Sequence, residues 1–255
     1  RNHYLYDSIR GANNQLISWV TAAQTTVVNR MTGFDSNGFD IGTDGEVNNT
    51  NETYVSWNWK AGGAPTATNT NGAGLAPTPD SVMIDGVSST TFLSGTLPAK
   101  NISANTDAGF SIVKYTSNAG GFTAAHGLNI TPQVVLLKRT DNSSIWYFNT
   151  TVIDGSYDYL RLNTTDLKTN TSGVSAPTSE VFSIAHTATG TETWIGYCFH
   201  SVDGFSDIGS YIGTGAAGNT IVTGFRPAFV MWKAAVRPSG GGSWYMYDNK
   251  RTTSN

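Results

Sequence analysis

Apolar and polar residues alternate with a period of two wherever this 255-residue chain shows a regular pattern. In residues 54–59, Val55, Trp57 and Trp59 fall on one side, as in a strand with one buried face. Residues 134–138 and 229–233 are nearly continuous apolar runs, which predict central strands buried on both faces. No segment keeps a helical period over eleven residues. The pattern predicts an all-β protein.

Turn-forming dipeptides separate these predicted strands. Asn-Gly, Asp-Gly and Gly-Gly pairs occur at 37–38, 44–45, 203–204 and 240–242. Many short strands with turns every ten residues or so are typical of an antiparallel β-sandwich, in which loops carry the function.

The sequence also repeats itself. Two segments, 39–43 and 53–59, recur as 182–186 and 193–199, about 140 to 144 positions later, and 15–21 corresponds to 159–165. A second set has a period of about 95 to 99 positions. It pairs 127–138 with 224–233 and 144–149 with 243–248, and residues 4–7 belong to the same set.

These periods predict a division of the chain into β-modules. Residues 109–214 form a complete sandwich module, 1–60 the late half of a preceding one, and 215–255 the early half of a following one. Residues 61–108 are expected to be a Gly/Ala/Thr/Asn-rich linker that lies extended on a surface, with a small hairpin within 81–97. We therefore interpret the chain as a segment of a tandem array of modules, cut from a longer polypeptide.

The two half-modules bear on assembly. Neither can bury its inner face alone, because the rows Val55, Trp57, Trp59 and Phe229, Met231 would stay exposed. The halves can pair within this chain, with flanking sequence, or across copies by strand exchange. We expect a homo-oligomer rather than a stable monomer with two complete isolated domains.

One segment, residues 34–46, resembles a calcium loop in part. Asp35, Asn37 and Glu46 match the first, third and twelfth ligand positions of an EF-hand. Phe39 and Asp40 occupy the fifth ligand position and the glycine position, so the match fails at the turn. In the second copy, Thr178, Glu180 and Ser183 replace the acidic and amide residues. We therefore expect a polar turn before a strand at 39–41, and no metal or other cofactor.

Composition narrows the classes of partner. Charged residues make up only 13% of the chain, about half the usual share, and the formal net charge is −3. No basic patch indicates nucleic-acid binding, and no apolar run is long enough to insert in a membrane. The lone Cys198 excludes an intrachain disulfide and is expected to be buried and inert.

Candidate chemistry is sparse. The histidines share no metal-ligand spacing, Gly-x-Ser-x-Gly is absent, and residues 213–218 lack the βαβ context of a phosphate loop. Asp203 and Asp207 are spaced to serve as a glycosidase pair, but the residues between them favour a turn. Most of the tryptophans are expected in the core. We predict no catalytic, cofactor-binding or metal site. The histidines are His3, His126, His186 and His200, and the tryptophans are Trp19, Trp57, Trp59, Trp146, Trp194, Trp232 and Trp244.

Several motifs in order resemble an uncharacterised module that recurs in structural proteins of marine tailed phages, including cyanophages. The resemblance rests on residues 61–65, 102–116, 197–199, 209–215 and 224–230 and covers nearly the whole chain. It implies a lectin-like β-sandwich of the concanavalin or jelly-roll type in a virion, within a tail or fibre-like appendage. It transfers no catalytic or binding residues.

Three functions follow as hypotheses. The first is a non-enzymatic structural and adhesion protein on the virion surface, which contacts other copies, other virion proteins or host-surface glycans. The second is a secreted carbohydrate-binding module attached to a hydrolase. The third, a virion depolymerase, is disfavoured by the sparse carboxylates.

Overall fold

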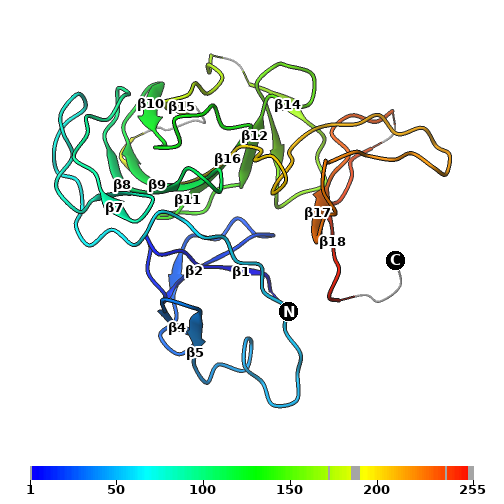
Figure 1. Cartoon of the computed structure of the whole chain (residues 1–255), viewed down its shortest axis with the longest axis horizontal. Coiled ribbons are helices and arrows are strands. Elements are labelled where there is room, and N and C mark those ends of the chain that lie inside the picture. The colour runs from blue at the N-terminus through cyan, green and yellow to red at the C-terminus, as the bar shows by residue number, and fades with distance from the viewer. Residues whose placement is uncertain (1, 172, 185–189, 239, 252–255) are drawn as a thin grey trace.

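A single large sheet organises the molecule. The structure, a computed structural model, describes residues 2–171, 173–184, 190–238 and 240–251, and within these ranges it contains strands but no helix. The all-β prediction is confirmed. The sheet has nine strands in the order β14-β13-β12-β11-β16-β9-β8-β6-β7 (Figure 1). All its pairings are antiparallel except the parallel pair β6–β8.

The strands of this sheet come from residues 82–199. Their bounds are Val82–Ile84 (β6), Val87–Ser88 (β7), Ala99–Asn105 (β8), Phe110–Ser117 (β9), Val134–Arg139 (β11), Tyr147–Thr150 (β12), Asp158–Arg161 (β13), Thr169–Asn170 (β14) and Glu192–Phe199 (β16).

Strand β16 lies near the middle of the sheet. It pairs with β9 along its whole length and with β11 from Trp194 to Phe199. The predicted central strand at 134–138 is confirmed, because β11 lies between β12 and β16. Apolar side chains therefore leave these strands on both faces, and each face needs a cover.

The first face is covered by a small sheet made of β10 (Phe122–Ala125) and β15 (Val181–Ile184). Between the two sheets lies the larger core. Cys198 is fully buried there, as predicted. This face-to-face packing is consistent with a β-sandwich. Members of this core include Val82, Ile102, Val113, Tyr115, Ala124, Val135, Leu137, Phe182, Trp194 and Cys198.

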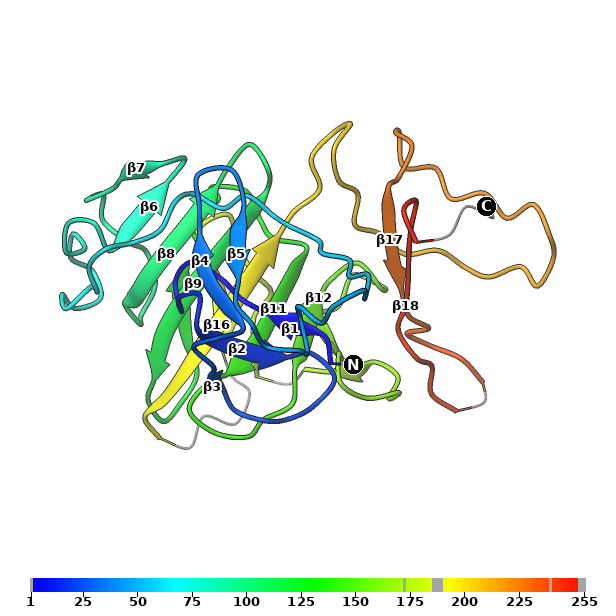
Figure 2. The same cartoon turned by 90° about the horizontal axis from the view of Figure 1, so that it is seen from below.

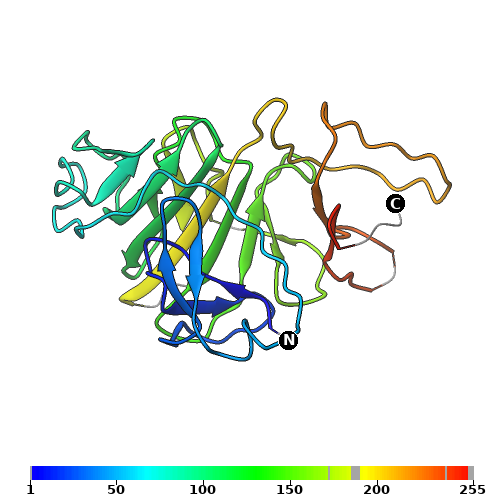
Figure 3. The ribbon, with the colours of Figure 1, turned by 60° about the horizontal axis from the view of Figure 1, so that its bottom comes forward.

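The second face is covered by a three-stranded sheet from the N-terminal part of the chain. It contains β1 (Tyr4–Leu5), β2 (Asn14–Ile17) and β3 (Thr25–Thr26), and Figures 1 and 3 show it on the side opposite β10 and β15. Leu16 and Trp146 are fully buried against Ile112, Ile195 and Tyr197. Residues from both predicted modules therefore share one core.

Residues 61–108, expected from the sequence to be a linker, contribute three strands to the main sheet. The hairpin expected within 81–97 is present as β6 and β7, and this hairpin and β8 all belong to the main sheet. Residues preceding the hairpin lie extended along β8, where Asn101 and Ser103 donate hydrogen bonds to the carbonyls of Ala67 (2.7 Å) and Gly63 (2.5 Å). A Cβ on Gly62 would lie 2.0 Å from the Ala104 carbonyl oxygen, so this close approach requires glycine.

Two strand predictions near the chain ends are wrong. Residues 53–59 form no strand, and Val55 and Trp59 are exposed rather than directed inward. The run at 229–233 is not central: β17 (Phe229–Trp232) pairs only with β18 (Tyr245–Asp248) among the described residues (Figure 2). A strand needs cross-strand partners to persist, and neither segment finds a full set in the described structure.

The turn expected before residue 39 is confirmed. Strands β4 (Met31–Phe34) and β5 (Phe39–Ile41) form a hairpin. The turn is closed by a hydrogen bond from the Asp35 N–H to the Gly38 carbonyl at 2.9 Å.

His126 is a structural residue whose neutral form the fold selects. Its buried ring accepts a hydrogen bond from the Leu128 N–H at Nδ1 (3.2 Å) and, as that tautomer, donates from Nε2 to the Thr178 carbonyl (3.1 Å). Burial lowers the pKa of His126 to about 4. The unfolded chain therefore takes up a proton below its usual pKa of about 6.5 while the folded protein does not.

We predict that acid destabilises the protein through this group. Between pH 7 and pH 4 the free energy of unfolding should fall by roughly 3 kcal/mol because of His126. Denaturant titrations at both pH values measure this change, and His126→Gln should lose that part of it. An equal pH dependence in both proteins would contradict the prediction.

Candidate functional site

The structure separates the acidic and amide residues of the calcium-like segment. Asp35 and Asn37 are exposed in the β4–β5 turn, whereas Glu46 accepts a hydrogen bond from the Tyr4 hydroxyl at 3.3 Å. Within the described ranges no three His, Cys, Asp or Glu residues form a group that could hold a metal ion.

The other candidate residues are also dispersed. Asp203 and Asp207 are exposed around a turn closed by a bridge between Val202 and Ser206. Residues 213–218 are an exposed loop. His3 is exposed, His200 is buried with Nδ1 2.8 Å from the Ser201 carbonyl oxygen, and His186 lies outside the described residues. The expectation that most of the tryptophans lie in the core is wrong: Trp146 and Trp194 are core residues, Trp19 and Trp59 are more than half exposed, and the other three are partly buried because the segments that carry them find few partners.

The most distinctive arrangement is a set of contacts that occurs twice. We define the first junction as the contact between residues 17–24 and residues 138–146. The second junction joins residues 161–168 to residues 233–244. The corresponding sides of the two junctions are 144 positions apart and 95 to 98 positions apart, which are the two periods of the sequence repeat.

A tryptophan indole forms the same bond in each junction. Trp146 Nε1 donates to the carbonyl of Ile17 at 3.0 Å, and Trp244 Nε1 donates to the carbonyl of Arg161 at 3.0 Å. Ile17 and Arg161 end the equivalent strands β2 and β13. Each tryptophan thus holds the end of a strand that precedes it in the chain.

Backbone hydrogen bonds repeat in the same way. The Ser144 N–H donates to the Thr21 carbonyl at 2.8 Å, and the Gly242 N–H donates to the Thr165 carbonyl at 2.8 Å. In a second pair of backbone hydrogen bonds, the donor lies in the earlier segment of the chain and the acceptor in the later one. This pair consists of Gln24 N–H to the Thr140 carbonyl (3.0 Å) and Lys168 N–H to the Ala235 carbonyl (2.9 Å).

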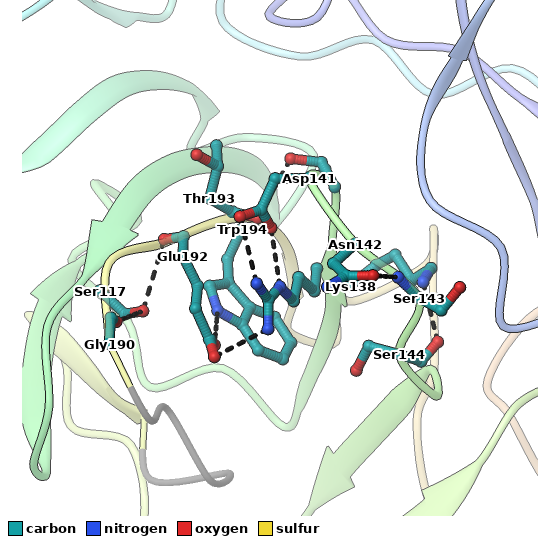
Figure 4. Close-up of polar contacts among 12 residues, drawn as sticks. Ser117, Lys138, Asp141, Asn142, Ser143, Ser144, Gly190, Glu192, Thr193 and Trp194 are labelled. Carbon is teal, nitrogen blue, oxygen red and sulfur yellow. Dashed lines mark hydrogen bonds and ion pairs between the residues drawn. The ribbon is translucent and has the colours of Figure 1, made fainter.

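A lysine completes each junction. Lys138 is fully buried, and its Nζ donates to the carbonyls of Thr21 (3.0 Å) and Ser144 (2.8 Å) (Figure 4). Lys233, which is partly buried, also donates to two carbonyls, those of Thr164 (2.6 Å) and Arg161 (3.2 Å), although these are not the counterparts of the two that Lys138 contacts. Burial lowers the pKa of both, to about 8 for Lys138. Both ammonium groups bind carbonyl dipoles rather than a carboxylate.

A carboxylate–guanidinium pair binds the N-terminal sheet to β16. Asp7 and Arg10 form a buried ion pair at 2.5 Å. The Tyr197 hydroxyl donates to Asp7 Oδ2 at 2.7 Å and accepts from Arg10 at 3.3 Å. Burial acts to lower the pKa of Arg10, but the Tyr197 and Asp7 oxygens raise it above its ordinary value.

The same pair recurs near the C-terminus. Asp248 and Arg251 form an ion pair at 2.5 Å, and Asp248 accepts the backbone N–H of Arg251 just as Asp7 accepts that of Arg10. The guanidinium of Arg251 lies 5.0 Å from the ring of Trp57, which is the repeat counterpart of Tyr197. Sequence reasoning missed this pair. The signal was a Tyr-x-Tyr-Asp motif at 4–7 and 245–248, followed in both copies by an arginine three residues after the aspartate.

A polar cleft of about 280 Å³ opens beside the first junction. On one side of it, Arg139 bridges Asp141 (2.8 Å) and Glu192 (2.8 Å), and Glu192 accepts the indole N–H of Trp194 (3.1 Å) (Figure 4). Each acidic group is held by the same cation, which suits rigid positioning rather than proton transfer. The cleft is lined by Arg10, Asn14, Gln24, Lys114, Thr140, Asp141, Thr193, Trp194 and Ile195.

Fold and site together define an all-β protein in which one set of packing contacts recurs along the chain. The sequence matches the family model of a domain of unknown function, DUF7483, over residues 1–78 and 84–255, and the protein belongs to this family. Neither the curated proteins nor the solved structures include a significant match. In the described part of the chain, no helix is long and apolar enough to span a membrane.

The indole bond of the first junction can be tested directly. Trp146→Phe should lower the free energy of unfolding by about 1–2 kcal/mol beyond the loss of ring area, because the Ile17 carbonyl is left without its donor. The matched variant Trp244→Phe should cost less, since Trp244 is only partly buried. Chemical denaturation measures both; equal losses would argue against the role of burial.

The ion pair with Tyr197 gives a second prediction. Asp7→Asn should destabilise the protein by about 3 kcal/mol, because it leaves the buried Arg10 charge uncompensated. Asp248→Asn should cost clearly less, because the Arg251 side chain is 40% exposed and water can solvate its charge when the partner is removed. Thermal unfolding of the two variants separates these outcomes, and a larger loss for Asp248→Asn would refute the assignment.

Proposed function

We propose that this protein is a non-enzymatic structural and adhesion protein on the surface of a tailed-phage virion, in a tail or fibre-like appendage. The observation that carries the proposal is the recurrence of one junction at two places in the chain. Interfaces that join the two sides of a repeat head to tail generate extended assemblies. An extended assembly is what an appendage requires.

In this proposed role, the recurring contacts belong to tandem, lectin-like β-sandwich modules. Strands β1-β2-β3 pair in the register of β12-β13-β14: Leu5 lies opposite Leu16 as Phe148 lies opposite Leu160. The motifs resembling marine phage structural proteins support the same interpretation. Its partners are other copies of the protein, other virion proteins and host-surface glycans.

Carbohydrate binding is the second candidate, in a secreted module attached to a hydrolase. The polar cleft beside the first junction favours it, since amide, hydroxyl and carboxylate groups line it and suit sugar hydroxyls. The Trp194 ring at this cleft is 3% exposed, so it offers little face for stacking on a sugar. For this reason we rank structural assembly first. Depolymerase activity ranks third, because Asp203 and Asp207 lie exposed in a turn.

Immunogold electron microscopy tests the proposed location. An antibody raised against this chain should label a fixed position on particles purified from a lysate of the source phage. Label confined to soluble, non-sedimenting material would overturn the virion assignment. An antibody against an unrelated soluble phage enzyme serves as the control for trapped material.

A glycan array with the purified chain separates the two candidates at the cleft. A positive signal that Asp141→Asn abolishes would favour the carbohydrate-binding function. Binding that persists in this variant would locate recognition elsewhere on the surface.

A further inference from the structure

The two ends of the chain expose apolar residues whose repeat counterparts are buried. Phe39 in β5 is 42% exposed, whereas Phe182, its counterpart in β15, is fully buried. Ile221 is 46% exposed, whereas its counterpart Ala124 in β10 is fully buried. The two exposed residues thus correspond to two residues that cover each other in the complete unit.

The complete unit shows how such residues pair. Strands β10 and β15 are antiparallel, with Ala124 opposite Phe182 and Ala125 opposite Val181. Transferred through the repeat, this register places Ile221 opposite Phe39 and Val222 opposite Gly38. Val222 is itself largely exposed. Residues 38–41 and 219–222 therefore correspond to the two strands of the small β10–β15 sheet, and β5 additionally pairs with β4 along one edge.

These halves lie apart within one molecule. Strand β5 is beneath the large sheet in Figure 1, whereas residues 219–222 belong to the extended loop that precedes β17 and lies at the right of the view (Figures 1 and 2). From the N-terminal side, the segment after β5 reaches the C-terminal hairpin, where the rings of Trp57 and Phe229 are 5.4 Å apart. That contact involves side chains, and among the described residues no strand pairing joins β5 to residues 219–222.

We propose that strand β5 of one copy pairs with residues 219–222 of a second copy of this chain, in the register of β15 with β10. The exchange buries Phe39 and Ile221 against each other and covers the aromatic face of the β17–β18 hairpin. That face carries Val230, Trp232, Tyr245 and Tyr247 and corresponds to the face of β11 and β12 that β10 and β15 cover.

The contact is head to tail, because the two surfaces come from opposite ends of the chain. Each copy keeps one unused half at each end, so the contact propagates into rings or filaments instead of closing as a symmetric dimer. This inference specifies the self-association within the proposed structural role. The register itself follows from the repeat, wherever the protein resides.

Disulfide trapping in the full 255-residue chain tests the register. The double variant Phe39→Cys/Ile221→Cys should give dimers, trimers and higher species on a non-reducing gel after mild oxidation, and reducing agent should remove them. Both positions are exposed, so the folded unit should tolerate the changes. The native Cys198 is buried, and burial raises the pKa of its thiol to about 12, so it should not react.

Matched variants define the alternatives. Asp40→Cys/Ile221→Cys shifts the register by one residue, which directs the two thiols to opposite faces, and should give far less product. Single variants Phe39→Cys and Ile221→Cys measure symmetric dimers and should not form ladders. A cross-link confined to the monomer, equal linkage in the shifted pair, or no linkage would each overturn the proposal.

Sedimentation velocity of the wild-type chain gives a second measure. The average mass should rise with protein concentration, and Phe39→Asp should suppress that rise without unfolding the exposed hairpin. A monomer at every concentration would refute the exchange. Particle labelling by the antibody could still succeed in that case, so failure of the exchange is distinguishable from failure of the virion assignment.

Discussion

Burial of strand β16 on both faces is the constraint on which the rest of this structure depends. Trp194 and Cys198 leave one face and enter the larger core, while Ile195 and Tyr197 leave the other. A sheet that is apolar on both sides must be covered twice. Strands β10 and β15 cover one side. The N-terminal sheet covers the other and is fixed there by the Asp7–Arg10 pair and by Trp146, whose polar atoms are satisfied by neighbouring groups.

The two junctions explain how a nearly neutral, polar chain achieves specific packing. Few of their bonds join opposite charges; indoles, amides and lysine ammonium groups bind backbone carbonyls instead. Carbonyl partners depend on backbone position more than on side-chain identity. The same junction can therefore form between units whose sequences differ. Ile17 and Arg161, for example, occupy equivalent positions, and each accepts the indole bond through its backbone carbonyl. Buried donors without such partners would be costly, so the register is strongly specified.

Counterpart segments of the repeat fold differently because their neighbours differ. Residues 192–199 form β16 between two long strands, whereas residues 53–59 form no strand and leave Trp59 exposed. Their apolar alternation is similar. Strand formation, however, requires paired backbone groups and cross-strand side chains, and only the first segment has both. Likewise β11 is central whereas β17 is in a two-stranded hairpin. Local pattern thus indicates a capacity to form a strand, and pairing decides whether the strand forms.

The sequence by itself determined the all-β class, the buried Cys198, the turn before β5 and the central position of β11, because period-two alternation, isolated cysteine and turn residues are local signals. The repeat periods also matched Trp146 with Trp244 and Lys138 with Lys233, but they did not indicate which segments these residues contact. Only the tertiary structure decided that residues 99–105 join the main sheet and that the N-terminal strands share its core. The contact of Asp7 with Tyr197, and the position of Arg139 between the carboxylates of Asp141 and Glu192, also follow only from the tertiary structure. Such contacts join residues up to 190 positions apart, and their partners are fixed by how the layers stack, which no local pattern records.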